Sequence, residues 1–195
     1  QKPGPEEAIV KTGLGGLAAR TGSGMVVIPL LQESQRMDLS VKRIEIAREG
    51  EDGLICQVNI RADIRVAFYV RVNNADADIK QVAEMISPHR ASEIVQLREL
   101  FEAKFSEALK TVGKQFDFVS LYTDRDNFRD EIINVIGTDL NGYRLDNCHI
   151  DYLEQTPLES LNPTNILDAE GIRKITELTT QENMKRNHFS VEEAK

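Results

Sequence analysis

A glycine-rich run near the start of the sequence is the first pattern that suggests chemistry. Residues 13–18 read GLGGLA and fit the dinucleotide-binding pattern G-x-G-x-x-G/A. In that pattern a helix begins directly after the glycines, and its N-terminus binds the pyrophosphate. Here a second glycine turn, TGSG at residues 21–24, follows closely and precedes a strand-like run. We therefore expect a glycine turn at this place and no bound cofactor.

Metal binding would require histidine, cysteine or carboxylate side chains at matched spacing. The three histidines are His89, His149 and His188. Only His149 has a candidate co-ligand beside it, Cys148, and neighbouring residues of a strand point to opposite faces. We expect no metal site.

An acidic cluster, Asp124, Asp126 and Asp130, has some resemblance to a calcium-binding loop. The glycine that such a loop needs at its sixth position is missing, and Phe128 and Arg129 interrupt the pattern. Carboxylates near the start of a helix are stabilised by the helix dipole alone. We therefore favour capping, with Asp124 as the N-cap of a helix.

The two cysteines, Cys56 and Cys148, are too few for a disulfide framework and have no C-x-x-C spacing. Both lie in or beside apolar strand-like runs, so we expect buried thiols in a reducing compartment. A thiol nucleophile would need a base such as His89 beside Cys56; that arrangement stays open, but nothing in the sequence positions it. No G-x-S-x-G or G-x-x-x-x-G-K-[ST] motif occurs. We expect no catalytic residues and no enzyme activity.

The net charge limits the kinds of partner that this chain can bind. The net charge is −8, with 29% charged and 41% hydrophobic residues, which is typical of a globular protein. An acidic chain is a poor match for nucleic acid, which needs a basic face. It is also a poor match for anionic lipid, so membrane contact would have to be apolar or be supplied by a segment outside this sequence.

The longest apolar run, residues 25–31, contains Pro29 and is far shorter than the roughly 20 residues of a membrane-spanning helix. No signal peptide is visible, and the sequence begins with Gln1. We therefore interpret the sequence as a fragment of a longer protein, and the absence of an anchor here says little about the whole.

Apolar patterns predict strands in the first fifty residues. Residues 7–12 and 25–28 predict two strands, joined by glycine turns into a hairpin-like unit. In residues 39–47 the apolar positions change phase, with Leu39 and Val41 on one side and Ile44 and Ile46 displaced by one position. This change predicts a β-bulge near Arg43.

The clearest pattern is the strict alternation of apolar and polar residues from 57 to 72. Period two predicts one long strand with one buried face, and the wet second face indicates an antiparallel sheet.

From residue 74 the period becomes helical. We expect helices at 79–86, closed by Pro88, at 94–112, ended by Gly113, and at 124–140, ended by Asn141 and Gly142. Residues 143–153 predict a strand, and 168–181 a final helix. This order predicts an α+β fold rather than a doubly wound α/β fold.

Several short stretches of this sequence have counterparts in a known family. They are PEEAIVKTGLGG at 5–16, AFYVRV at 67–72, LNGYRL at 140–145, IDYL at 150–153 and, most specifically, TPL, LNP and NILDAEGIRKI within 156–175. Together they cover essentially the whole chain. The sequence resembles the flotillin-like members of the SPFH, or band 7, family, and above all bacterial flotillin-like inner-membrane proteins.

The resemblance implies a fold and a division of the chain. The fold is an antiparallel, bent sheet with packed helices, followed by the start of an extended coiled-coil helix. Residues 1–50 would form a first, membrane-proximal subdomain and 51–157 a second one. Residues 158–195 would form a linker and the first part of the coiled coil. The spacing of Ile172, Ile175 and Leu178 predicts the oligomerisation seam of that helix.

The resemblance also implies a function without catalytic residues. Such proteins scaffold membrane microdomains by assembling into large rings or cages, here expected on the cytoplasmic face of a bacterial inner membrane. Expected partners are further copies of the chain, membrane lipid and a small NfeD-type membrane protein with an OB-fold. The alternative is an interaction module that regulates or recruits a membrane partner, either the NfeD-type protein or a membrane protease.

Membrane contact is expected from the first fifty residues. Leu14 and Leu17 are the best candidates, because they lie among turn glycines. The neighbouring apolar residues at 26–28, 30 and 31 would either join them at the inner leaflet or form the core of the domain.

Overall fold

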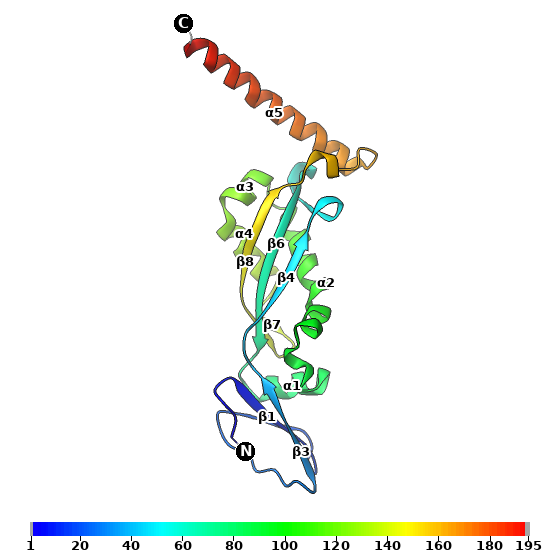
Figure 1. The fold of residues 1–195 in the computed structure, drawn as a ribbon, viewed down its shortest axis with the longest axis vertical. Helices are drawn as coiled ribbons and strands as arrows, with labels where there is room; N and C mark the ends of the chain where they lie inside the picture. Colours follow the sequence, from blue (N-terminus) through cyan, green and yellow to red (C-terminus); the bar gives the residue numbers. More distant parts are fainter. Residues whose placement is uncertain (1, 194–195) are drawn as a thin grey trace. The chain divides into compact units, whose positions relative to one another are not determined.

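A computed structural model describes residues 2–193 (Figure 1). The chain forms two compact units, and each is built from three separate stretches of sequence. The first unit contains residues 1–46, 66–108 and 129–149, and the second contains 47–65, 109–128 and 150–195. The subdomain boundaries at 50 and 157, inferred from family resemblance, stay a prediction.

A three-stranded antiparallel sheet lies in the first unit. Its strands are β1 (Glu7–Gly13), β2 (Ala18–Thr21) and β3 (Gln32–Asp38), in the order β2-β1-β3. Gly13 stands opposite Gln32 at one end of the β1·β3 pair, and Glu7 stands opposite Asp38 at the other. The predicted strand at 7–12 is therefore confirmed as β1.

The predicted strand at 25–28 is wrong. These residues lie in the loop that joins β2 to β3, and Val26 is 82% exposed. The β-branched residues here favour a strand, but β2 and β3 already occupy both edges of β1. Pro29 follows directly and has no N–H to give to a ladder. The apolar side chains of this run therefore belong to a loop with an exposed apolar surface, and they do not indicate a strand.

A second, curled antiparallel sheet contains five strands. They are β4 (Lys42–Arg48), β5 (Leu54–Ile55), β6 (Arg61–Val72), β7 (Asp139–Leu140) and β8 (Tyr143–Gln155), in the order β4-β6-β8-β7, with β5 paired to β6. The long alternating strand is confirmed as β6, and the strand at 143–153 as β8. The pattern begins later than expected, because Val58 has a φ of 53° and lies in the 3-10 turn η2 (Gln57–Asn59).

The predicted bulge near Arg43 is a break between two strands. β3 ends at Asp38 and β4 begins at Lys42, so the apolar pattern restarts in a new phase. Leu39 is buried and Val41 is exposed, and they do not share a face.

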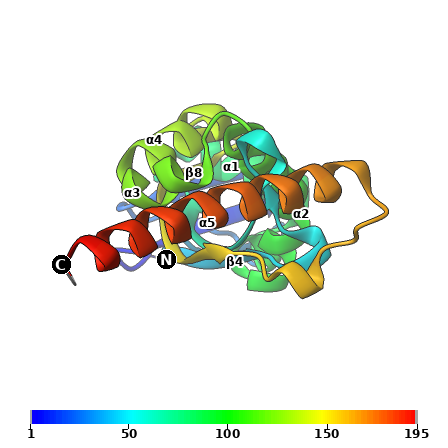
Figure 2. The same cartoon turned by 90° about the horizontal axis from the view of Figure 1, so that it is seen from above.

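Five α-helices complete the described chain, and the α+β class is confirmed. They are α1 (Asp76–Ile86), α2 (Ile94–Gly113), α3 (Phe118–Thr123), α4 (Arg125–Ile136) and α5 (Ile166–Glu193). Three further 3-10 turns are η1 (Gly50–Asp52), η3 (Arg90–Ser92) and η4 (Leu158–Ser160). α1 ends before Pro88 and α2 ends at Gly113, as predicted. α5 is one unbroken helix in both views (Figures 1 and 2).

The helix predicted at 124–140 is too long by four residues. α4 ends at Ile136, where Gly137 has a positive φ, as is common just beyond a helix. Asn141 and Gly142 form the turn between β7 and β8, and both have positive φ, as a two-residue hairpin of type I′ requires. The Asn-Gly pair therefore indicates a hairpin here, and not the end of a helix.

α3 has no counterpart in the sequence prediction. Asp117 caps it, with its carboxylate accepting from the Ser120 N–H at 3.0 Å. Hydrogen bonds from Ser120 hold the pKa of the Asp117 carboxyl below its usual value. Asp124 lies between α3 and α4, where its carbonyl accepts from the Phe128 N–H at 3.2 Å.

An aromatic cluster fills the core of the first unit. Phe68 stacks on Phe105 with ring centroids 4.4 Å apart, and Phe101 contacts both Phe105 and Tyr143. The Tyr143 hydroxyl donates to the Ala91 carbonyl at 2.6 Å, so the one polar atom of the cluster is satisfied.

Candidate membrane-contact site and helix junction

Exposed apolar side chains gather at the Gly13 end of the three-stranded sheet. We call this group the apolar apex, and it consists of Leu14, Ile28, Leu30 and Leu31. Leu14 is 67% exposed and Leu30 is 95% exposed. Val26, in the same loop, is also exposed, whereas Leu17 and Val27 are half-buried. The alternative that these residues form the core of the domain is therefore wrong for the apex.

The apex is built tightly onto the end of β1. The Leu14 N–H donates to the Leu31 carbonyl at 3.0 Å. Gly13 has a φ of 114°, and a Cβ at this position would overlap the Leu31 carbonyl. Only glycine allows the two chain segments to approach this closely.

The three-stranded sheet is attached to α1 through the first helical residue, Asp76. Its carboxylate accepts from the Thr21 N–H at 3.1 Å and lies 3.5 Å from the Arg20 guanidinium. A carboxylate in the first turn of α1 is also favoured by the helix dipole. These contacts hold the end of β2 on α1.

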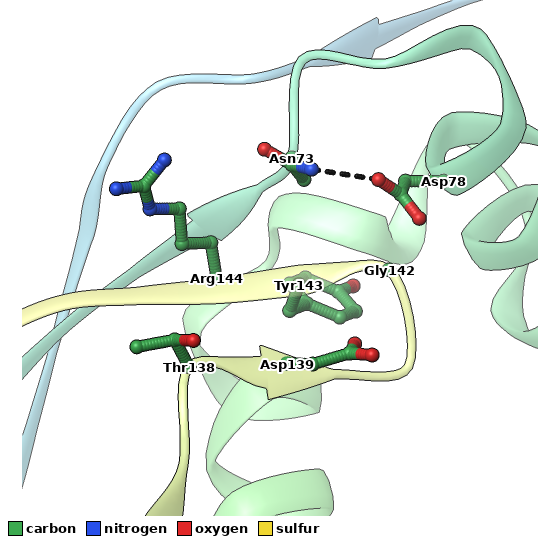
Figure 3. Close-up of a pocket in the computed structure, with 7 residues that line it drawn as sticks. All are labelled: Asn73, Asp78, Thr138, Asp139, Gly142, Tyr143 and Arg144. Carbon is green, nitrogen blue, oxygen red and sulfur yellow. Dashed lines mark hydrogen bonds between the residues drawn. The ribbon is translucent and has the colours of Figure 1, made fainter. Parts of the chain in front are cut away.

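A polar cavity of about 310 Å³ lies elsewhere in the first unit, at the β7–β8 turn (Figure 3). It is lined by Asn73, Asp78, Thr138, Asp139, Gly142, Tyr143 and Arg144. The Asn73 side chain donates to the Asp78 carboxylate at 2.6 Å, and a Cβ on Gly142 would stand 2.7 Å from the Asp78 carbonyl. No lining residue is a cysteine or histidine, and the Tyr143 hydroxyl is already used in the core. The cavity can offer hydrogen bonds to a small polar molecule.

The residues considered for cofactor and metal chemistry lie apart. Gly15 and Gly16 have positive φ and form a turn before β2, so no helix begins at the GLGGLA run. The predicted glycine turn is confirmed. Within residues 2–193, no three His, Cys, Asp or Glu side chains gather closely enough to hold a metal ion. His149 packs edge-on against the Tyr69 ring.

Both thiols are buried, as predicted. Burial, with a smaller effect of Asp117, raises the pKa of Cys56 from 9.0 to about 12. Burial likewise raises the pKa of Cys148 to about 11. Since the thiolate is the reactive form, neither side chain is prepared to act as a nucleophile at neutral pH.

A buried ion pair fixes the start of α5 within the second unit. The Arg61 guanidinium of β6 donates to Asp168 at 2.5 Å, and these side chains are 11% and 3% exposed. Asp168 also accepts from the Asn162 N–H at 3.0 Å. Arg61 makes a second bond to the Gly53 carbonyl at 3.2 Å. A buried carboxylate needs such partners, and here they come from β6 and from the segment that precedes α5.

The same junction shows close backbone contact. A Cβ on Gly171 of α5 would overlap the Asn59 carbonyl of η2. Val58 and Asn59 both have positive φ, which is unusual for a β-branched residue such as Val58. The Asn59 side chain donates to the Glu170 carboxylate at 2.5 Å. The strained turn and the small helical residue together let α5 lie directly against η2.

The three residues of the predicted seam have different surroundings. Ile175 is buried with Ile60 and Leu161, and Ile172 packs against this cluster half-buried. Leu178 is 40% exposed. The first two therefore attach α5 to its own unit, whereas Leu178 is exposed to solvent, and the seam stays a prediction.

Comparison with known proteins identifies the family to which this chain belongs. The chain belongs to the SPFH domain / Band 7 family, whose sequence pattern matches residues 2–195. The family resemblance of the sequence is thus confirmed.

Two relatives are flotillin family proteins of bacterial inner membranes. The chain is 34% identical over 184 residues to the flotillin family inner membrane protein YqiK of Escherichia coli (strain K12), covering 93% of this chain and 33% of the relative. It is 29% identical over 156 residues to the flotillin family inner membrane protein sll1021 of Synechocystis, covering 79% of this chain and 23% of the relative. This chain thus spans a third or less of the length of these relatives. In the described part of the chain, no helix combines the length and the apolar character needed to cross a bilayer.

Sequence reasoning missed two residues that organise these sites. Asp168 was placed only as the start of a helix, although it lies in the most specific family stretch, NILDAEGIRKI. Gln32 was not considered, although it is the first polar residue after the apolar run at 25–31.

We predict that Asp168→Asn lowers the free energy of unfolding by about 3–5 kcal/mol, because Arg61 then keeps a buried charge without its counter-ion. The measurement is urea-induced unfolding followed by circular dichroism. Glu177→Gln is the control, since Glu177 pairs with Lys174 on the exposed side of the same helix and should change stability by less than about 1 kcal/mol. Equal effects of the two substitutions would contradict the role given to the buried pair.

The two thiols make the stability of the folded chain depend on pH. Their folded pKa values lie above 9.0, so the folded state holds these protons more tightly than the unfolded chain. Their contribution to stability is fully present below about pH 9 and is lost as the pH rises towards 11 and 12. We expect iodoacetamide to modify both cysteines slowly at neutral pH, and rapidly after unfolding, as measured by mass spectrometry. Rapid modification of the folded chain would show that the thiols are not buried.

Proposed function

We propose that this chain is the membrane-contacting and assembly-directing part of a non-catalytic scaffold on the cytoplasmic face of a bacterial inner membrane. The scaffold organises membrane microdomains by assembling into large rings or cages. Membership of the SPFH domain / Band 7 family and two inner-membrane relatives support this function. The apolar apex is the observation that carries it, because four large side chains are held in water at one end of a well-packed sheet.

In this proposal the apex lies in the bilayer interface, with Leu14 as its first contact and half-buried Leu17 beside it. Each leucine that moves from water into an apolar layer contributes roughly 1.5–3 kcal/mol. The chain has a net charge of −8, so attraction to anionic lipid is not the driving force. Apolar burial alone accounts for the contact.

Self-assembly is assigned to α5 and its continuation as a coiled coil. The buried Arg61–Asp168 pair and the Gly171 contact orient the first turns of α5 on their own unit. Beyond Ile175 every described side chain of the helix is exposed. A helix of this kind is marginal in water by itself and is stabilised by packing against another chain. We therefore place the start of the seam with further copies at Leu178.

A second candidate function is an interaction module for a membrane partner, either an NfeD-type protein with an OB-fold or a membrane protease. The observation in its favour is the exposed apolar pair on α3, Val119 and Tyr122. Aromatic and aliphatic side chains of this kind anchor protein interfaces. A stoichiometric 1:1 complex that depends on Val119, formed by chains that do not self-assemble, would favour this function.

We predict that the double substitution Leu14→Ser and Leu30→Ser lowers partition onto phosphatidylcholine vesicles by roughly tenfold or more. The measurement is vesicle flotation of the chain, quantified over a range of lipid concentrations. Leu158→Ser is the control, since Leu158 is exposed in the second unit and should leave partition unchanged. Flotation that is equal for both variants would remove the apex from membrane contact.

We predict that Leu178→Ser in the full-length protein shifts the population from large assemblies to small ones, because it removes the first reachable apolar contact of the seam. Electron microscopy and light scattering of the membrane extract provide the measurement. Met184→Ser is the matched control, since Met184 is also exposed but lies about 240° further around the helix. Assemblies of unchanged size with Leu178→Ser would contradict the seam.

A further inference from the structure

When a loop leaves water for an apolar layer, its polar backbone groups add a free-energy cost, whatever side chains the loop carries. Each backbone N–H or carbonyl that leaves water without a hydrogen-bond partner is penalised by several kcal/mol in hydrocarbon. Loops rarely satisfy these groups internally, since their backbone is irregular. The apolar apex therefore needs a device for its polar backbone if its leucines are to leave water.

Gln32 supplies such a device with its side chain. Its Nε2 donates to the Leu14 carbonyl at 2.8 Å, and its Oε1 accepts from the Ile28 N–H at 3.2 Å. One bond reaches the β1–β2 turn and the other reaches the β2–β3 loop. A single side chain thus joins the two segments that carry the apex.

The backbone around Gln32 extends this bonding. The N–H groups of Leu31 and Gln32 both donate to the Ile28 carbonyl, at 3.0 and 2.9 Å, while the Leu14 N–H donates to the Leu31 carbonyl. Both polar backbone groups of Leu14 and both of Ile28 therefore have partners within the apex. The outward-facing atoms of these two residues are their apolar side chains.

We propose that Gln32 is a positioning residue that closes the apex into a preformed apolar cap, and that the cap enters the hydrocarbon layer of the bilayer. This inference rests on the proposed membrane contact and adds how the contact becomes possible. The bonds are exposed to water in the free chain, where they contribute little because water competes for both groups. In a layer without water the same two bonds become necessary.

The chemistry of the surroundings favours acyl chains over charged headgroups as the ligand. Residues 21–32 contain no charged side chain. The nearest basic groups are engaged, since Arg20 lies 3.5 Å from Asp76 and the Lys11 ammonium donates to the Val26 carbonyl at 3.4 Å. No cluster of basic residues in this segment is arranged to bind phosphate.

The residue type at position 32 follows from the bonding. The position needs one donor and one acceptor on the same planar group, and the glutamine amide offers both on neighbouring atoms. Glutamate has the same shape but no donor for the Leu14 carbonyl, and it brings a charge. Alanine removes both bonds while leaving the backbone of β3 able to pair with β1.

The test uses the absence of tryptophan from this chain. Leu30→Trp places one indole in the cap, and its fluorescence is quenched when it approaches phosphatidylcholine with brominated acyl chains. We expect strong quenching in this parent variant, and a vesicle partition roughly tenfold weaker after the further change Gln32→Ala or Gln32→Glu. Gln35→Ala is the matched control, because Gln35 lies on the same strand and its side chain contacts only Glu33, at 3.4 Å, outside the apex. It should retain full quenching.

Thermal unfolding in water separates positioning from a merely structural role. Gln32→Ala should leave the unfolding temperature nearly unchanged, since its bonds are solvated in the free chain. Equal quenching with and without Gln32 would overturn the inference and leave the membrane contact standing. No quenching in the parent variant would overturn the membrane contact itself. Binding that appears only with anionic phosphatidylglycerol would overturn the assignment to acyl chains.

Discussion

Both compact units depend on the register of β6, which decides which of its side chains are buried. Residues 61–65 belong to the second unit and 66–72 to the first. All the even-numbered side chains from Ala62 to Val72 are buried. A slip of one residue would expose this whole row, so hydrophobic burial fixes the register strongly.

The alternate, polar side chains of β6 make contacts with other segments of the second unit. Arg61 meets Asp168, and Asp63 accepts from the Gly50 N–H at 2.9 Å and from the Thr156 hydroxyl at 2.6 Å. Arg65 lies 2.6 Å from Glu49. The contact of Arg61 with the start of α5 therefore depends on the register of a strand far from it in sequence. Both charges of the ion pair lose water on burial, so removing one partner costs more than the intact pair contributes.

Periodic elements could be predicted from the sequence, and special turns could not. β6, α1, α2 and β8 were predicted because each repeats its apolar pattern over several turns or pleats. The strand expected at 25–28 was wrong because propensity does not reveal whether a strand edge is free to pair. An Asn-Gly pair such as Asn141 and Gly142 is typical both of a helix end and of a hairpin turn. The short strand β7, which precedes the pair, shows that the pair forms a hairpin turn here. α3 is too short to show a period.

The candidate sites were predicted in part for the same reason. Leu14 was singled out from its glycine neighbours, and it is exposed. The core alternative for Leu30 could not be decided, because an apolar run has the same composition in a core and on a surface. Gln32 and Asp168 act through partners 18 and 107 residues away, and no local pattern in a single sequence shows such pairs.

The interleaving of the two units has a consequence for how such a domain can be divided or exchanged. Each unit is assembled from three stretches that alternate along the chain, and β4, β6, α2, α4 and β8 each cross from one to the other. No single cut separates them, so a truncation that removes one unit also severs the strands and helices of the other. Engineering by fusion, swapping or circular permutation must therefore keep the stretches from β4 to β8 together.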